Sequence, residues 1–287
     1  MSLFYKIGGL VIQTEDNFND FAKYHLSNYQ TESTEHPDIC IQTHMNCENI
    51  PLPEGTPIAE INKRFWLKTK NNGYAFYDRV EEFSDKVLNA LVADSEFRNI
   101  EVWHCPTFLL NIEEDYRAYY IIQKILRFAL LMHNGLIVHA SSLAYQNQGL
   151  LFSAPSGTGK STHTNLWLQH APGTIIVNDD MPIIRIENQI PYLYGAPWSG
   201  KNSIHQNIRV PLSAFVFLER DVTCSLTPMD TMEAVWRLFD AIRKPAIPDL
   251  AEKSLDIVAR LISTVPAYLL RCDMSKEAVE TAMTALQ

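Results

Sequence analysis

Apolar side chains recur along this chain in two spacings, which predict helices and strands in the C-terminal two thirds. Residues 113–133 carry apolar side chains at helical spacing over a wide face, which predicts a long, well-buried helix ending at Asn134-Gly135. The same spacing predicts helices over residues 231–243, 250–265 and 275–286. Alternating or continuous apolar runs predict strands at residues 136–145, 149–153, 173–180, 181–187, 190–194, 212–218 and 267–272.

The first 115 residues predict shorter elements. An Asn-Gly turn between aromatic runs predicts a hairpin over residues 65–77, and residues 4–13 predict either a strand pair or one bent strand, with Gly8-Gly9 at the bend. Further predictions are strands at residues 38–43 and 100–105, a short helix at 17–29 and a loop at 46–57. We therefore expect a smaller α+β domain over residues 1–115 and an α/β domain over 116–287. The helix at 113–133 either opens the second domain or joins the two.

Composition narrows the range of functions. The chain has 287 residues, 46% of them hydrophobic, as in an ordinary globular protein. Its formal net charge of −9 argues against a general nucleic-acid or anionic-membrane partner. No signal-peptide pattern is present, and no apolar run approaches the roughly 20 residues of a membrane span. The five cysteines are scattered and form neither a zinc pattern nor a disulfide framework, so we expect reduced thiols and a cytoplasmic protein.

One stretch, Ala154-Pro-Ser-Gly-Thr-Gly-Lys-Ser161, matches a relaxed phosphate-binding loop, with Ala where the stricter pattern has Gly. A predicted strand precedes it and a predicted helix follows, which is the context that the motif requires. Backbone N–H groups around the loop glycines and the positive end of the helix dipole would face phosphate oxygens. We expect nucleotide phosphates to bind at Ser156, Gly157, Thr158, Gly159, Lys160, Ser161 and Thr162.

The neighbouring strands add candidate chemistry. A four-residue turn at residues 146–149 makes the strand that carries His139 antiparallel to the strand that feeds the loop. The next strand ends in Asp179 and Asp180, and carboxylates at a strand end beside a phosphate loop suit a bound metal. A second loop, residues 195–201, carries Lys201, which would either contact phosphate or belong to a structural turn.

His139, the loop Gly149–Ser161 and Asn178-Asp-Asp180 together resemble the HPr kinase/phosphorylase and phosphoenolpyruvate carboxykinase superfamily. The resemblance covers residues 130–275 and is greatest with the HPr kinase-like proteins of modified-peptide gene clusters. It implies an α/β mixed-sheet P-loop kinase domain that binds ATP and Mg²⁺ and is able to form a homo-oligomer. The Gly-rich, Arg-containing second signature of true HPr kinases is missing, so HPr itself is not implied as the substrate.

By this resemblance Lys160 and Ser161 bind phosphates, and Ser161 and Asp180 hold Mg²⁺. Asp179 accepts the proton of the attacking hydroxyl with help from His139, although the roles of the two aspartates remain interchangeable. Lys201, then Arg243, Arg209 or Arg220, would supply a further cation, while His163 and His205 are expected to be surface or capping residues. We expect a kinase that acts on a Ser of a peptide or protein, or on a small alcohol. The alternative is a nucleotide-gated binding module that captures a peptide without chemistry; a full phosphoenolpyruvate carboxykinase is disfavoured by the short chain.

Overall fold

The computed structural model describes residues 2–15, 20–79, 86–105, 114–200 and 203–287, with the side chains of 114–118 left out. The chain divides into two compact units, Met1–Met132 with Pro245–Ala251 and His133–Lys244 with Glu252–Gln287. Within the part of the chain so described, no helix has both the length and the apolar character to cross a membrane. The domain boundary near residue 115 stays a prediction. In the structure the division falls after Met132, because Phe128 of the long helix packs on Trp66 and Phe97 in the first unit.

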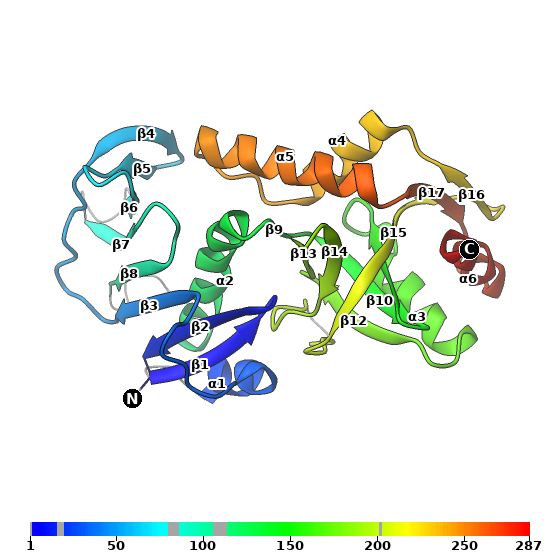
Figure 1. The fold of residues 1–287 in the computed structure, drawn as a ribbon, viewed down its shortest axis with the longest axis horizontal. Coiled ribbons are helices and arrows are strands. Elements are labelled where there is room, and N and C mark those ends of the chain that lie inside the picture. The colour runs from blue at the N-terminus through cyan, green and yellow to red at the C-terminus, as the bar shows by residue number, and fades with distance from the viewer. Residues whose placement is uncertain (1, 16–19, 80–85, 106–113, 201–202) are drawn as a thin grey trace. The chain divides into compact units, whose positions relative to one another are not determined.

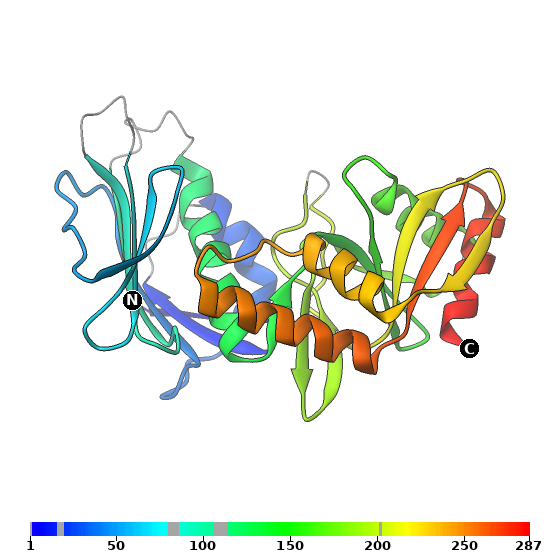
Figure 2. The ribbon, with the colours of Figure 1, turned by 90° about the horizontal axis from the view of Figure 1, so that it is seen from above.

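The first unit contains a mixed sheet of eight strands in the order β1-β2-β3-β8-β7-β6-β5-β4. Figure 2 shows helices α1 and α2 on one side of this sheet. Of the two alternatives for residues 4–13, the structure has the strand pair, with β1 antiparallel to β2. The hairpin predicted over residues 65–77 is confirmed as the antiparallel pair β5–β6, whereas β4 and β7 were not predicted. The elements are β1 Ser2–Ile7, β2 Leu10–Glu15, α1 Asp20–Leu26, β3 Ile39–His44, β4 Thr56–Ile61, β5 Arg64–Lys68, β6 Tyr74–Arg79, β7 Val87–Ala93, β8 Asn99–His104 and α2 Glu114–Met132.

The second unit is built on a mixed sheet whose main path runs β12-β10-β11-β15-β14-β13-β9, with β17 and then β16 added beside β15. Strand β11 is parallel to β15, and β15 is parallel to β17, so these three strands end at one edge. The strands are β9 Gly135–Ile137, β10 Ala140–Tyr145, β11 Gln148–Ser153, β12 Ile175–Asp180, β13 Ile183–Glu187, β14 Ile190–Tyr194, β15 Arg209–Arg220, β16 Ser225–Pro228 and β17 Ala267–Cys272. The helices are α3 Lys160–His170, α4 Thr231–Ala241, α5 Pro248–Thr264 and α6 Lys276–Met283.

Helices lie on both faces of this second sheet. Trp167 of α3 and Ala278 and Val279 of α6 join Phe152 and Val216 of the strands in one buried cluster. Helix α4 lies on the other face, as Figures 1 and 2 both show. The strands of the sheet therefore carry side chains toward α3 and toward α4 in alternation, and this separates two sides of the phosphate loop.

Most predicted elements of this unit are present, including the antiparallel pairing of β10 with β11. Two details differ. The connecting turn has two residues, Gln146 and Asn147, both with positive φ, instead of four. The single strand predicted at residues 136–145 is wrong, because the chain bends at His139, where its N–H donates to the carbonyl of Ala241 at the end of α4. Before the bend, β9 pairs with β13; after it, β10 pairs with β11 and β12.

Candidate functional site

The phosphate-loop sequence joins the end of β11 to the start of α3, as its pattern predicts. Gly157 and Gly159 have φ values of 79° and 122°, which favour glycine over any residue with a side chain. A Cβ atom at either position would meet no atom within 4 Å, so the outer side of the loop is open. Helix α3 begins at Lys160 without a side-chain cap, and its first N–H groups are therefore available to an anion.

Arg220 fixes the loop from its other side. Its Nε donates to the carbonyl oxygen of Thr158 at 2.9 Å, and its Nη2 donates to that of Gly157 at 2.6 Å. A peptide carbonyl and the N–H of the next residue point in opposite directions across the peptide plane. Holding the two carbonyls therefore turns the following N–H groups away from Arg220. This residue was expected only as a candidate cation over the phosphate.

Three charged or ionisable side chains form a connected row beside the loop. The Nζ of Lys160 donates to the carbonyl of Ala154 at 2.9 Å and lies 3.3 Å from Nε2 of His139. The Nδ1 of His139 lies 3.1 Å from Oδ1 of Asp180. Because an ammonium group only donates, Nε2 is the accepting nitrogen, and Nδ1–H of the neutral ring donates to Asp180. Burial lowers the pKa of Lys160, and the charges of Asp180 and then Asp179 oppose that effect.

Asp179 occupies a different position from its neighbour. It pairs across the strands with Ser141, whose hydroxyl lies 2.9 Å from that of Thr164 in α3. Directly opposed residues of an antiparallel pair share a face of the sheet, so Asp179 lies on the α3 side. Its carboxylate is buried, with 6% of the residue exposed, and Oδ1 has no partner among the described residues. A buried carboxylate oxygen without a partner is costly, and a bound cation or donor would relieve that cost.

Asn178 holds the two aspartates in place. This fully buried side chain donates from Nδ2 to the carbonyls of Ala196 and Trp198, at 2.7 and 3.0 Å. Its Oδ1 accepts from the backbone N–H groups of Asp180 and Met181, at 3.1 and 2.7 Å. One amide thus joins the end of β12 to the loop that follows β14. The sequence showed Asn178 only as part of the motif and gave no sign of this role.

Glycines in that loop allow the close approach. A Cβ atom on Gly195 would lie 1.7 Å from the carbonyl oxygen of Gln206, and one on Gly200 would lie 3.2 Å from that of Asp179. The loop therefore covers the aspartates, while Lys201, its expected phosphate contact, lies outside the described residues. Of the other candidate cations, Arg209 is held by Glu187 and the ring of Tyr192 in the β13–β14 hairpin, and Arg243 has an exposed side chain.

Two cavities flank the phosphate loop. The α3-side cavity, of about 240 Å³, is lined by residues that include Thr158, Thr162, Leu166, Leu218, Arg220 and Met274. The α4-side cavity, of about 380 Å³, is lined by residues that include His139, Ser153, Ser156, Phe217, Arg237 and Asp240. The row of Lys160, His139 and Asp180 thus borders the second cavity through His139.

His163 is not the surface residue that the sequence suggested. It is 3% exposed, and its Nε2 accepts a hydrogen bond from the indole N–H of Trp167 at 3.2 Å. Burial lowers its pKa to about 4. The helical spacing of His163 and Trp167, four residues apart, was the available signal that the two side chains meet.

Comparison with known proteins adds little to this geometry. No protein-family model and no curated protein matches the chain. Among solved structures, it is similar to the Hpr(Ser) kinase/phosphatase from Coxiella burnetii at 15% identity, over 32% of this chain and 70% of that chain, with a TM-score of 0.25. A likeness at this TM-score carries no argument, and the functional reasoning below rests on the site itself.

Proposed function

We propose that this protein is an ATP-dependent phosphotransferase that phosphorylates a hydroxyl group, with its second unit acting as a P-loop kinase domain of the HPr kinase type. The observation that carries the proposal is the row of Lys160, His139 and Asp180 beside an open phosphate loop. Phosphoryl transfer requires an anchored triphosphate, a cation near the transferred group and a base near the acceptor. The loop, Lys160 and His139, which adjoin one another, would supply these three parts.

The loop is suited to the triphosphate. The N–H of Thr158 donates to the carbonyl of Pro155 at 3.2 Å. The open outer side of the loop, its uncapped helix start and the Arg220 contact with the carbonyl of Thr158 would leave the N–H of Gly159 and those of the first turn of α3 for phosphate oxygens. Lys160 would exchange its contacts with Ala154 and His139 for phosphate oxygens. That exchange frees Nε2 of His139, the only ring nitrogen that is able to accept a proton.

The residues also fit Mg²⁺, which prefers oxygen ligands and typically takes one or two carboxylates together with substrate phosphates. The unpartnered Oδ1 of Asp179 and the Ser161 hydroxyl at the start of α3 would hold the ion. Among the described residues, no three His, Cys, Asp or Glu side chains are placed to hold a metal ion together. When bound, Mg²⁺ neutralises charge on the transferred phosphate.

The contacts favour different roles for the two aspartates, one beside the base and one at the metal. Asp180 orients His139 through Nδ1, so that Nε2 accepts the proton of the acceptor hydroxyl. Asp179, on the α3 side, serves the metal. This division reverses the assignment drawn from the resemblance, in which Asp179 was the base and Asp180 the metal ligand. The α4-side cavity beside His139 would then receive the acceptor, a Ser of a peptide or protein or a small alcohol.

Two substitutions test the division. Asp180→Asn should keep ATP binding and lower transfer by about 10² to 10⁴, with a changed pH profile, because His139 loses the carboxylate that orients it. Asp179→Asn should instead raise the Mg²⁺ concentration needed for half-maximal transfer. Asp256→Asn, on the exposed side of α5, is the matched control and should leave both readouts unchanged. If Asp179→Asn slows transfer and Asp180→Asn raises the Mg²⁺ requirement, then Asp179 is the base and Asp180 the metal ligand, as the resemblance implied.

The proposal as a whole is tested with γ-labelled ATP, Mg²⁺ and host lysate separated into macromolecular and small-molecule fractions. Label that moves into either fraction with the wild type and not with Lys160→Ala supports phosphotransfer and identifies the acceptor class. If ATP binds and no label moves into either fraction, phosphotransfer is refuted and a nucleotide-gated binding module becomes the better explanation.

A further inference from the structure

The α3-side cavity lies next to the phosphate loop but away from the proposed reacting groups. The parallel strands β11, β15 and β17 end at the same edge of the sheet, and ligands of such sheets bind at this edge. Thr158, Gly159 and Thr162 line the cavity, so it is continuous with the loop and the first turn of α3. None of Lys160, His139 and Asp180 lines it.

This arrangement gives a bound triphosphate a direction. The phosphate to be transferred would lie near His139, which borders the α4-side cavity. The other end of the phosphate chain would then leave along Gly159 and Thr162, into the α3-side cavity. Alternation along β15 supports this separation, because Phe217 lines one cavity and Leu218 lines the other.

The walls of the α3-side cavity suit a flat, partly polar ring. Leu166 and Leu218 supply apolar surface, and Met274, which is 63% exposed, lies at the rim. Arg220 also lines the cavity, and its two contacts with the loop, through Nε and Nη2, do not engage Nη1. A guanidinium held in this way presents a plane on which an aromatic ring is able to stack.

His163 adds a hydrogen-bond donor to the wall. Because its Nε2 accepts from Trp167, the proton of the neutral ring is on Nδ1. This Nδ1 is buried and has no partner among the described residues, and His163 is one of the residues that line the cavity. An acceptor on a ligand, such as a ring nitrogen or a ribose oxygen, would satisfy the donor.

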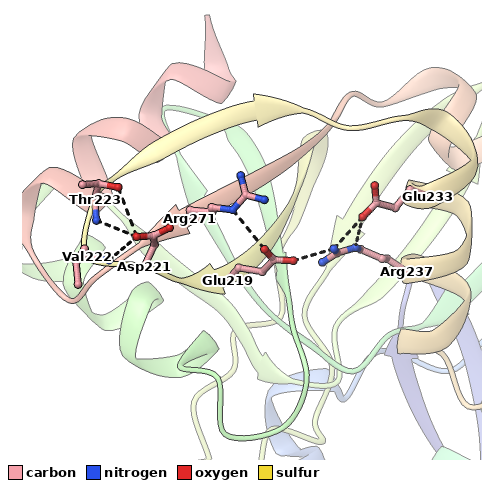
Figure 3. Close-up of polar contacts among 7 residues, drawn as sticks. All are labelled: Glu219, Asp221, Val222, Thr223, Glu233, Arg237 and Arg271. Atoms are coloured by element: carbon pink, nitrogen blue, oxygen red, sulfur yellow. Dashed lines mark hydrogen bonds and ion pairs between the residues drawn. The ribbon is translucent and has the colours of Figure 1, made fainter.

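The carboxylates at the rim are already engaged by the protein. Figure 3 shows Glu219 between Arg237 and Arg271, with distances of 2.8 and 3.5 Å. The same view shows Oδ1 of Asp221 accepting from the backbone N–H groups of the next two residues. Two arginines thus compensate Glu219, whereas Asp221 and Asp273, which also line the cavity, have only neutral hydrogen-bond partners here. Their negative charge suits the nucleoside end of a nucleotide better than a further phosphate.

We propose that the α3-side cavity binds the nucleoside of the nucleotide, with the base between Leu166, Leu218 and the guanidinium of Arg220. The inference rests on the proposed nucleotide-binding function and adds the site that distinguishes a nucleotide from a bare polyphosphate. Arg220 thereby links two parts of the ligand, because the same side chain fixes the phosphate loop and borders the base.

The test compares ATP with inorganic tripolyphosphate, each with Mg²⁺, by isothermal titration calorimetry on the full chain. The wild type should bind ATP about tenfold or more tightly than tripolyphosphate, since burial of a base adds affinity that the phosphates cannot supply. Met274→Trp adds bulk at the exposed rim. It should lower the affinity for ATP by about tenfold and change the affinity for tripolyphosphate by no more than about twofold. Met232→Trp is the matched control, because Met232 is 62% exposed and lies on α4.

The outcomes separate the two proposals. Equal affinity of the wild type for ATP and tripolyphosphate would refute the nucleoside cavity while leaving the phosphate site intact. An unchanged ATP affinity in Met274→Trp, or equal losses for both ligands, would also refute it. If the wild type binds neither ligand, the proposed function fails and this inference fails with it. Lys160→Ala should lower the affinity for both ATP and tripolyphosphate, because it removes a contact to the phosphates that the two ligands share.

Discussion

The role of Asn178 leads to a quantitative prediction. Asn178→Ala removes four buried hydrogen bonds and leaves two carbonyls and two N–H groups without their partner. At a net value of about 1 kcal/mol for each hydrogen bond, the free energy of unfolding of the second unit should fall by roughly 4 kcal/mol. That loss is a large part of the roughly 5–15 kcal/mol that stabilises a typical domain.

Ser142→Ala is the matched comparison. Ser142 is equally buried on the neighbouring strand, and its hydroxyl donates one hydrogen bond of 3.1 Å to the carbonyl of Asn178. Removing this one bond should cost about 1 kcal/mol. The two variants thus differ by roughly 3 kcal/mol, although each removes a single small polar side chain from the same region.

The assay is urea unfolding, followed by tryptophan fluorescence and far-ultraviolet circular dichroism with linear extrapolation to water. Trp198 is 2% exposed in the loop that Asn178 holds, so its emission should change as that loop is released. If Asn178→Ala destabilises the protein no more than Ser142→Ala does, the amide does not hold the loop and the reasoning is refuted. Asn178→Asp should be at least as harmful as Asn178→Ala, because a carboxylate would face two carbonyl oxygens.

Two further predictions concern the same unit. Gly195→Ala should lower the melting temperature strongly, because its Cβ would lie 1.7 Å from the backbone oxygen of Gln206 and no side-chain rotation relieves that overlap; an unchanged melting temperature would contradict the close approach. The pKa of His163 is lowered to about 4 in the folded protein, whereas in the unfolded chain it is about 6.5. Between these two pH values only the unfolded chain binds the proton. The contribution of His163 to the free energy of unfolding is therefore complete above about pH 6.5 and falls by about 1.4 kcal/mol per pH unit down to about pH 4. His163→Gln should remove this slope from urea-unfolding curves measured between pH 6.5 and 4, and identical slopes in the two proteins would refute the assignment.

Local patterns in the sequence determined much of the second unit. The Gly-rich run before Lys160 predicted a strand, a loop and a helix, because the positive φ at Gly157 and Gly159 is a local requirement. The short connection between the strands that end near residue 145 and begin near residue 149 predicted the antiparallel hairpin, because so few residues can join only antiparallel neighbours. Helices were also predicted over residues 231–243 and 275–286, and in the structure the side chains of Asp230 and Ser275 cap the two helices found there.

Tertiary structure decided how the chemical groups meet. The bend at His139 depends on a hydrogen bond to Ala241, about a hundred residues away in the sequence. The row from Lys160 through His139 to Asp180 brings together three segments, and its distances depend on how strands β10, β11 and β12 pair. Spacing along a chain contains no information about such distances, since they arise from packing between segments that are remote in sequence.

The sequence by itself therefore determined the course of the glycine-rich loop between a strand and a helix and the two acids that end the next strand, because those features are set by neighbouring residues. It did not determine which aspartate lies on the α3 side, that Arg220 holds the loop, or that His163 is buried. Each of these depends on which face of a strand or helix meets another element. Only the folded arrangement of the sheet and its helices fixes that choice.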